Sequence, residues 1–262
     1  MARRYGELSP RLRQIAEFVV DNPDTVALET VAVIAERAGV QPSAMVRFAQ
    51  ALGFDGFSDM QRPFRERLIE RSPTYAERLR REPPGPQGSD APGILTSVVT
   101  AGRSALDRLA DGLDRERLER AVGLLAMAPM VHLVAQRRSF PVVVYLAYGL
   151  GQLGRRAQLM DGMGGMLQHQ AKALGPGDAL LAVSFRPYAE ETMAVARLAR
   201  PAGASLVAIT DAPLSPLARI ADTALLVEES EIRGVRTLTA SMGLATTLIL
   251  AVGQRLLRDE TQ

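Results

Sequence analysis

The chain has no cysteine and only two histidines, His132 and His169. The missing thiols exclude disulfides and thiolate metal sites, and two imidazoles are too few for a histidine-built metal centre, so we expect neither metal nor cofactor. No apolar run reaches the roughly 18 residues of a membrane helix, and the N-terminus lacks the apolar core of a signal peptide. These absences predict a cytoplasmic protein without a membrane partner.

The composition fits two folded domains. The 262 residues exceed the usual size of one domain, and 47% of them are hydrophobic. The net charge is only +2, and the whole excess lies within residues 1–81. So small an excess does not by itself indicate a nucleic-acid partner.

The most informative segment is residues 30–52, which read as two short helices separated by a glycine. Thr30 is placed to cap the first helix, and Gly39 stands where the chain must turn at positive φ. Pro42 suits the first turn of the second helix. A stripe at i, i+3, i+4 and i+7 predicts its buried face: Met45, Phe48, Ala49 and Leu52. This arrangement is typical of a helix-turn-helix DNA-binding motif.

The opposite face of the second helix carries small polar groups and one arginine, which suit the major groove. We expect Gln41, Ser43 and Arg47 to approach bases, with Arg47 able to contact a guanine edge or a phosphate. The full set of predicted DNA-contacting residues is Gln41, Pro42, Ser43, Arg47, Gln50 and Arg62. The alternative is an ordinary helical hairpin with a solvated polar face.

Flanking residues extend the pattern into a known family. A capped helix begins at Leu8-Ser9-Pro10, and Asn22-Pro23 ends it. Together with the segment through Arg47-Phe48 and with Gly53-Phe54-Asp55-Gly56-Phe57, these residues resemble the N-terminal domain of RpiR-type (MurR/RpiR family) transcriptional regulators. The resemblance implies an all-α helix-turn-helix domain joined to a sugar isomerase (SIS) domain that senses phosphosugars.

A linker divides the chain, because residues 82–93 hold four prolines and three glycines. The predicted domains are therefore 1–81 for DNA binding and 94–262 for ligand sensing and oligomerisation. In the second domain, short apolar runs alternate with helical patterns, which predicts a doubly wound parallel sheet flanked by helices. The expected strands are 131–135, 157–160, 179–183, 206–209 and 224–227. The expected helices are 94–111, 114–127, 140–153, 164–174, 188–200, 214–221 and 239–258.

This half resembles the SIS domain in the turn ending at Ser139, in Gly175-Pro176-Gly177-Asp178 and in Val183-Ser184. In the family, hydroxyl residues after the first and third strands hold a sugar phosphate. The chain departs from that pattern in both loops. Ala135-Gln136-Arg137-Arg138-Ser139 replaces Gly-x-Gly-x-Ser, and Ser184-Phe185-Arg186-Pro187-Tyr188-Ala189 replaces Ser-x-Ser-Gly-x-Thr.

Lost glycines close a tight backbone cradle, whereas the added arginines offer charged bidentate donors. In one interpretation these loops form an altered site for an anion, a phosphate or a carboxylate. In the other the site is filled and the domain only oligomerises. The predicted ligand-binding residues are Arg137, Arg138, Ser139, Ser184, Arg186 and Tyr188. Tyr188 is placed either to wall the site or to pack within a helix.

Catalysis is the competing function class, because sugar isomerases of this fold move a proton with a glutamate or histidine base. Glu231 and His169 are the residues that we place near the strand ends, and neither lies in a recognised motif. His132, inside a strand, is expected to be structural. We therefore predict that the chain is not an enzyme.

The sequence thus predicts a ligand-responsive transcription factor whose effector is a phosphosugar or other small anion. One recognition helix reads only a few base pairs, so we expect a dimer or tetramer on palindromic double-stranded DNA. The helices at 94–127 and 239–258 are the expected contacts between copies. The alternatives are an isomerase-like enzyme, a regulator whose SIS domain only oligomerises, and a nonspecific DNA-binding protein.

Overall fold

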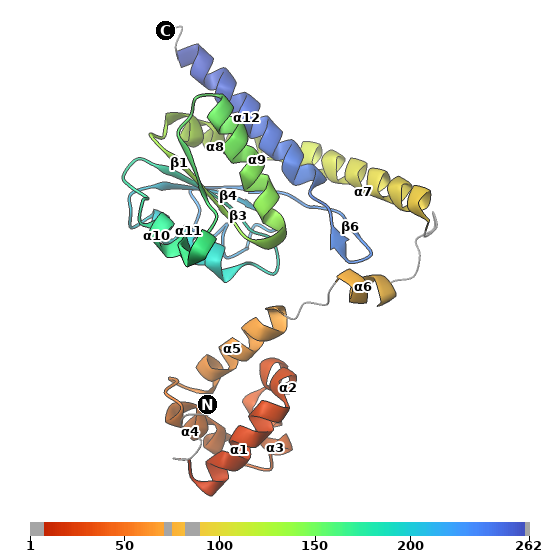
Figure 1. The fold of residues 1–262 in the computed structure, drawn as a ribbon, viewed down its shortest axis with the longest axis vertical. Helices are drawn as coiled ribbons and strands as arrows, with labels where there is room; N and C mark the ends of the chain where they lie inside the picture. The colour runs from red at the N-terminus through yellow and green to blue at the C-terminus, as the bar shows by residue number, and fades with distance from the viewer. Residues whose placement is uncertain (1–7, 71–74, 82–89, 260–262) are drawn as a thin grey trace. The chain divides into compact units, whose positions relative to one another are not determined.

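A computed structural model describes residues 8–70, 75–81 and 90–259 (Figure 1). The chain divides into two compact units, Met1–Glu77 and Arg78–Gln262.

The N-terminal unit is built from helices around one small core. Ile15, Ile34, Met45, Phe48 and Met60 are fully buried in it. Each helix between residues 10 and 70 contributes apolar side chains to this core, and the longer ones do so along one amphipathic face. In chain order the helices are α1 (Pro10–Asp21), α2 (Pro23–Leu28), α3 (Val31–Arg37), α4 (Pro42–Ala51) and α5 (Phe57–Glu70), and α6 (Tyr75–Arg81) spans the division between the units.

The helix starts follow from the capping residues that the sequence supplies. The hydroxyls of Ser9 and Thr30 accept hydrogen bonds from the backbone N–H groups of Leu12 and Val33, each at 3.5 Å. Both caps satisfy donors that a helix start leaves unpaired. The predicted caps of α1 and α3 are confirmed.

The C-terminal unit is a five-stranded parallel sheet, and Figure 1 shows helices covering it. The strand order is β2-β1-β3-β4-β5. The first strand, β1, therefore lies inside the sheet between β2 and β3, and crossover connections join these parallel strands. Val131 in β1 lies in register with Ala157 in β2 and Ala179 in β3. The strands are β1 (Val131–Ala135), β2 (Ala157–Met160), β3 (Ala179–Val183), β4 (Ser205–Thr210) and β5 (Thr223–Leu226).

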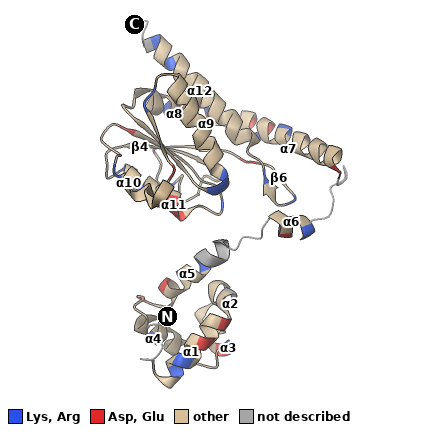
Figure 2. Ribbon diagram, viewed as in Figure 1, with Lys and Arg blue, Asp and Glu red and all other residues tan. Residues whose placement is uncertain are grey.

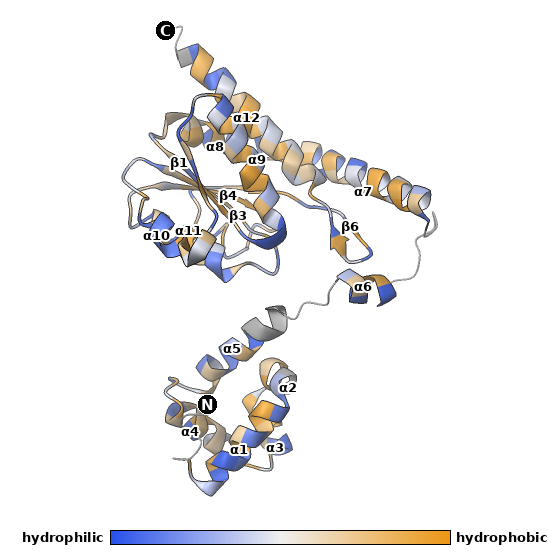
Figure 3. Ribbon diagram, in the orientation of Figure 1, coloured by the Kyte–Doolittle hydropathy of each residue, from blue (hydrophilic) through white to orange (hydrophobic). Residues whose placement is uncertain are grey.

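Two separate apolar clusters cover the two faces of this sheet. One cluster packs the sheet against α7 (Ala91–Gly112), α8 (Arg115–Met127), α9 (Phe140–Gln152) and α12 (Thr239–Asp259). The other packs it against α10 (Leu167–Ala171) and α11 (Glu190–Ala199). Figure 3 shows the strands as largely hydrophobic, as burial on both faces demands. The predicted doubly wound α/β fold is confirmed.

The structure corrects the predicted linker at its C-terminal end. Asp90 caps α7 through a 3.2 Å hydrogen bond from the backbone N–H of Gly93, so Pro92 and Gly93 lie in the first helical turn. Proline is tolerated there because its missing N–H has no partner in a helix start. Residues 82–89 lie outside the described residues.

In the second domain, one helix prediction is wrong and another helix is shorter than predicted. Residues 214–221 form turns rather than a helix, and residues 164–174 contain only the five residues of α10 after a short 3₁₀ turn. Gly162, Gly164 and Gly165 adopt positive φ, which a continuous helix does not allow. The antiparallel hairpin of β6 (Glu231–Ile232) and β7 (Val235–Arg236) was not predicted from the sequence.

One described helix, α12, is long and apolar enough by length and composition to cross a membrane. Ala240, Leu244, Leu248 and Val252 recur along it at helical spacing and are fully buried in the domain core. One face of α12 thus packs against the sheet and neighbouring helices, whereas Leu250 and Leu257 are exposed.

Candidate DNA-binding and effector sites

The turn between α3 and α4 is held by side chains of α1. Gly39 adopts φ +67°, as predicted, and the Val40 N–H reaches back to the Ala35 carbonyl at 2.9 Å. The Arg11 guanidinium donates to the Gly39 carbonyl at 2.7 Å, and the Gln14 amide donates to the Ala38 carbonyl at 3.0 Å. These bonds satisfy carbonyls left open at the helix end, and so fix the direction in which α4 leaves the turn.

Helix α4 has one buried face and one exposed polar face. Met45, Phe48 and Ala49 are fully buried, whereas Leu52 is only half-buried. Gln41, Pro42, Ser43, Arg47 and Gln50 are all exposed. The amphipathic split predicted from the sequence is therefore present.

The start of α4 is also open to a ligand. Gln41 precedes the helix without a side-chain hydrogen bond to it, so the first backbone N–H groups lack a capping side chain. Such amides favour a phosphate oxygen. The Arg47 side chain lies along the helix, with its Nε 3.4 Å from the Ser43 carbonyl, and is free to reorient because it is exposed.

Arg62 belongs to a different helix, α5, and is exposed. Its guanidinium forms an ion pair with Asp59 at 2.9 Å, one turn earlier. A phosphate contact by Arg62 would compete with this pair. The DNA-binding roles of all six residues stay predictions.

The predicted effector loops meet at the carboxyl edge of the sheet. Arg138, in the 3₁₀ turn that follows β1, donates from Nη2 to the backbone carbonyl of Arg186 after β3 at 2.8 Å. The structure thus brings the two loops into direct contact. Arg137 and Arg186 are exposed, and Figure 2 shows positive charge at the start of α9. Arg137 also adopts φ +58°, a conformation that is uncommon for a residue with a side chain.

The two predicted serines are buried beneath these loops. Ser139 and Ser184 follow the buried ends of β1 and β3. The Ser184 hydroxyl accepts a hydrogen bond from the Ala189 N–H at 3.3 Å, which braces the loop where it enters α11. Ser184 therefore has a structural contact in addition to its predicted ligand role.

Asp211, immediately after β4, organises the site and was missed by the sequence analysis. Its carboxylate accepts hydrogen bonds from the Tyr188 hydroxyl at 2.8 Å and from the Arg186 N–H at 3.1 Å. Arg236 of β7 lies 3.8 Å from the same carboxylate. A carboxylate directly after a buried strand is a signal that could have identified Asp211, whereas Arg236 belongs to the unpredicted hairpin.

Tyr188 has both an apolar and a polar contact. Its half-buried ring packs against the apolar cluster on one face of the sheet, and its hydroxyl donates to Asp211 at 2.8 Å. The ligand-binding role of Tyr188 stays a prediction. Burial raises the pKa of Tyr188, and the neighbouring Asp211 carboxylate raises it further. Tyr188 is therefore a neutral hydrogen-bond donor at physiological pH.

The residues considered for catalysis lie on three different elements of the C-terminal unit. His132 is buried inside β1, where its Nε2 lies 3.0 Å from the Asp178 carboxylate. His169 is exposed on α10, and Glu231 is exposed on β6, where it pairs with Arg236 of β7. Among the described residues, no group of three or more His, Cys, Asp or Glu side chains could hold a metal ion.

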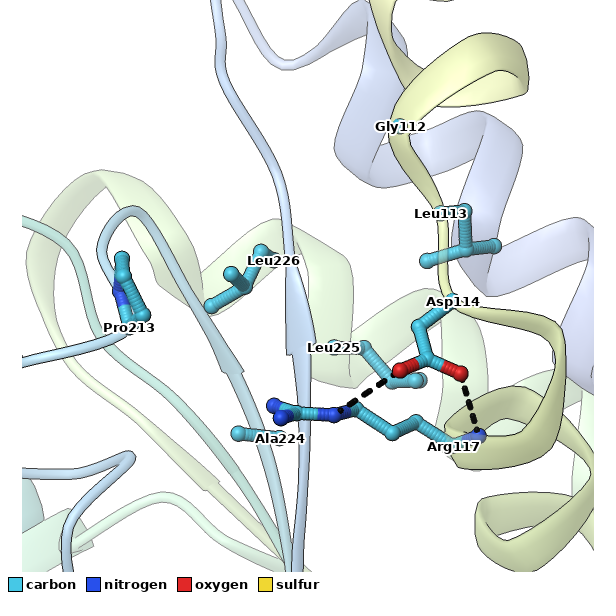
Figure 4. A pocket seen from close by; sticks show the side chains of 8 residues that line it. All are labelled: Gly112, Leu113, Asp114, Arg117, Pro213, Ala224, Leu225 and Leu226. Atoms are coloured by element: carbon cyan, nitrogen blue, oxygen red, sulfur yellow. Dashed lines mark hydrogen bonds and ion pairs between the residues drawn. The ribbon is translucent and has the colours of Figure 1, made fainter.

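A cavity of about 240 Å³ lies elsewhere on the same unit, at the edge strand β5 (Figure 4). Asp114 and Arg117 form an ion pair of 3.2 Å within it, and the Arg117 N–H also donates to Asp114. The remaining lining is mostly apolar and includes no residue of the arginine loops: Gly112, Leu113, Pro213, Ala224, Leu225 and Leu226.

Comparison with known families matches both halves of the chain. Residues 1–69 match the helix-turn-helix domain of the rpiR family, and residues 124–252 match the SIS domain. The chain therefore joins a helix-turn-helix domain of the rpiR family to a SIS domain. This confirms the resemblance stated from the sequence.

Among relatives, the chain is 29% identical over 248 residues to the bifunctional protein glk of Paraburkholderia xenovorans, covering 94% of this chain but 38% of that protein. It is 26% identical to the HTH-type transcriptional regulator HexR of Pseudomonas aeruginosa, over 87% of this chain and 79% of HexR. The sugar isomerase domain of an RpiR transcription factor from Sphaerobacter thermophilus superposes with a TM-score of 0.59 at 26% identity. That alignment covers 64% of this chain and 98% of the other.

Proposed function

We propose that this RpiR-family chain is a ligand-responsive, DNA-binding transcriptional regulator. The observation that carries the proposal is the exposed polar face of α4, presented by a helix whose other face is locked into the core. A helix held in this way can enter a major groove without unfolding its own domain. The similarity to HexR, a transcriptional regulator by name, supports the same function.

Binding to DNA requires more than one copy of α4, because one short helix contacts few base pairs. We propose a dimer or tetramer on a palindromic operator. Helix α7 supports self-association because adjacent apolar side chains along it are exposed: Ile94, Leu95, Val98 and Val99. Leu250 and Leu257 of α12 are exposed as well. Isolated exposed apolar residues are ordinary, but a contiguous row marks a contact surface.

The effector of this regulator is a small anion, such as a sugar phosphate, held at the loops after β1 and β3. Arg137 and Arg186 are exposed there, and the Arg138–Arg186 contact fixes the two loops relative to each other. Arginine binds phosphate and carboxylate groups through paired N–H donors. The competing proposal, a SIS domain that only oligomerises, requires that no anion binds at these loops.

We propose that the chain is not an isomerase, because its relative HexR is a transcriptional regulator by name and because neither His169 nor Glu231 lies in a recognised catalytic motif. A general base must lie within hydrogen-bond reach of the proton that it removes, or one water away. Turnover of sugar phosphates by the purified protein would overturn this part of the proposal.

The DNA-binding proposal is tested by selecting binding sites from a random duplex library with the full chain. Affinity for the enriched site and for a scrambled duplex of equal length is then compared by fluorescence anisotropy at one salt concentration. We expect a palindromic site that binds at least about 10³-fold more tightly than the scrambled duplex. Equal affinity for both would leave only a nonspecific DNA-binding protein.

The effector proposal is tested by calorimetric titration of the full chain with hexose phosphates, pentose phosphates, inorganic phosphate and small dicarboxylates. Arg137→Asn removes the charge while keeping a residue that tolerates positive φ, and it is expected to weaken binding about tenfold or more. Arg120→Gln, on the exposed side of α8, is the matched control and should bind as the wild type does. Absence of binding across the whole panel would contradict the anion site.

A further inference from the structure

The β6–β7 hairpin, residues 231–236, is firmly held at its base. Glu229 accepts hydrogen bonds from the Thr237 hydroxyl at 2.9 Å and from the Ser241 N–H at 2.7 Å, which ties the base to the start of α12. On the other side, Ser230 donates to the Ala101 carbonyl of α7 at 2.8 Å and accepts from Arg108 at 2.9 Å. The hairpin therefore projects from a fixed base between α7 and α12.

One strand of the hairpin reaches the proposed effector site. Arg236 has only 18% of its side chain exposed, and its Nη1 lies 3.8 Å from the Asp211 carboxylate. That buried Nη1 makes no hydrogen bond in the described structure. Asp211 in turn holds the Tyr188 hydroxyl and the Arg186 N–H. A charged donor with unused hydrogen-bonding capacity thus stands directly behind the arginine loop.

The tip of the hairpin contacts the end of α6. The Gly234 carbonyl accepts from Arg78 Nη1 at 2.5 Å, and Arg233 Nη2 donates to the Leu79 carbonyl at 3.1 Å. The Arg78 side chain lies so close to Gly234 that a Cβ at residue 234 would come within 2.6 Å of the Arg78 Cδ. Both α6 residues belong to the C-terminal unit, at the point where the chain connects to the DNA-binding unit.

We propose that this hairpin couples the effector site to α6, with Arg236 as the residue that senses the anion. An anion bound at the arginine loops competes with Asp211 for the Arg236 guanidinium. Because Glu231 pairs with Arg236 and Ile232 pairs with Val235 across the ladder, the short hairpin moves as one piece about its fixed base. This movement alters the hydrogen bonds that join the hairpin tip to Arg78 and Leu79.

This mechanism rests on the proposed function, since it needs an anion at the strand ends. It supplies what ligand control requires, namely a contact that differs between the bound and free states. Loosening or tightening then acts on α6 itself, the helix in which the two units divide. From the sequence, Glu231 was placed near the strand ends as a candidate base, but neither Arg236 nor a hairpin was predicted there.

The first test needs no ligand and uses hydrogen exchange of the full chain, read by mass spectrometry. Gly234→Ala must displace Arg78, and we expect exchange in peptides covering residues 75–81 to accelerate about fivefold. Gly154→Ala is the matched control: Gly154 has nearly the same φ, +72° against +74°, but nothing within 4 Å of an added Cβ. The control should leave α6 exchange unchanged.

Arg236→Gln tests the connection between the site and the helix. We expect this variant to accelerate exchange both at residues 184–188 and at residues 75–81, with peptides from α8 unchanged. If the variant alters residues 184–188 but not α6, the coupling proposal is contradicted.

A second arm adds inorganic phosphate and, separately, a hexose phosphate to the wild type. If neither changes exchange at residues 136–139 or 184–188, the proposed effector site fails, while the variants without ligand still decide the coupling. If an anion slows exchange at those loops, α6 exchange must change in the wild type and stay constant in Arg236→Gln. Equal responses of α6 in both proteins would overturn the proposal.

Discussion

At the residue scale, Arg47 is the side chain on which sequence-specific binding depends most. It is exposed on α4, between Met45 and Phe48 of the buried stripe, so its removal leaves the core intact. Arg47→Ala should cost about 1–3 kcal/mol of operator binding if the guanidinium contacts a base, and should narrow the preference for operator over scrambled DNA. The measurement is anisotropy at fixed, moderate salt.

Arg62→Ala gives the comparison for Arg47, because Arg62 lies on α5 and is already paired with Asp59. If Arg62 contacts phosphate, its loss weakens binding to operator and scrambled DNA equally. It also reduces the slope of log affinity against log salt concentration by about one. Unchanged operator binding by Arg47→Ala would contradict the assignment of α4 as the reading helix.

Tyr188 leads to a prediction about how the free energy of unfolding depends on pH. Burial and the hydrogen bond to Asp211 raise the pKa of Tyr188 above its ordinary value of 10.0. The unfolded chain therefore loses the phenolic proton first as pH rises, so the stabilisation is complete below about pH 10 and declines above it. Tyr188→Phe should lower the free energy of unfolding by about 1 kcal/mol at neutral pH, and this difference should shrink in strongly alkaline buffer.

Urea denaturation at neutral and alkaline pH checks the Tyr188 prediction, with Tyr148→Phe on the exposed side of α9 as the control. The control should match the wild type at neutral pH. A wild-type advantage over Tyr188→Phe that grows with alkalinity would contradict the role given to Asp211.

Residues whose roles are local could be predicted from the sequence, and residues whose roles depend on distant partners could not. Thr30, Gly39 and Pro42 act within a few positions of themselves, so spacing alone identifies them. Asp211 bonds to residues 23 and 25 positions away, and Arg11 bonds to a carbonyl 28 positions away. Such contacts exist only once the strands and helices have been assembled.

At the scale of elements, the packing of α9 against α12 offers a matched pair of substitutions. A Cβ added at Gly149 would overlap the Ile249 side chain of α12, whereas one added at Gly151 would meet nothing within 4 Å. Gly149→Ala should destabilise the domain by about 1–3 kcal/mol, because overpacking forces the helices apart. Gly151→Ala should be neutral or stabilise it by up to about 1 kcal/mol. Equal unfolding midpoints for the two variants would contradict this packing.

The elements that were predicted correctly have strong periodicity, and those that were missed do not. The five-residue strand β3 is a continuous apolar run, β1 is apolar except for His132, and α4 has a full amphipathic stripe. The β6–β7 hairpin has only two residues in each strand, which is too short for any period to show. Residues 214–221 look helical in composition, but hydrogen bonds to the Ser215 hydroxyl from Thr210 and Ala218 stabilise turns instead.

At the scale of the whole molecule, function depends on association of copies. Leu95 on α7 has 63% of its surface exposed within a row of apolar neighbours. We expect Leu95→Glu to shift the assembly toward monomer in light scattering and to reduce operator affinity about tenfold or more, since two reading helices would no longer be held together. Leu214→Glu, at an exposed leucine in a turn, is the control and should change neither.

The two-domain organisation followed from length, composition and the proline-rich segment, but its details did not. The structure begins α7 at Ala91, inside the predicted linker, because proline and glycine are allowed in a first helical turn. The compact units divide after Glu77, within α6. A helix that straddles a division between units carries no compositional signal, so the hairpin contact with α6 could be seen only in three dimensions.

The central claim is that the polar face of α4 reads duplex DNA. It is tested most directly by selecting sites from a random duplex library in parallel with the wild type and with Arg47→Ala. The account predicts a palindromic motif for the wild type, and loss or relaxation of specific positions in its half-sites for the variant. Recovery of the same motif at equal enrichment by both proteins, or of no motif by the wild type, would contradict it.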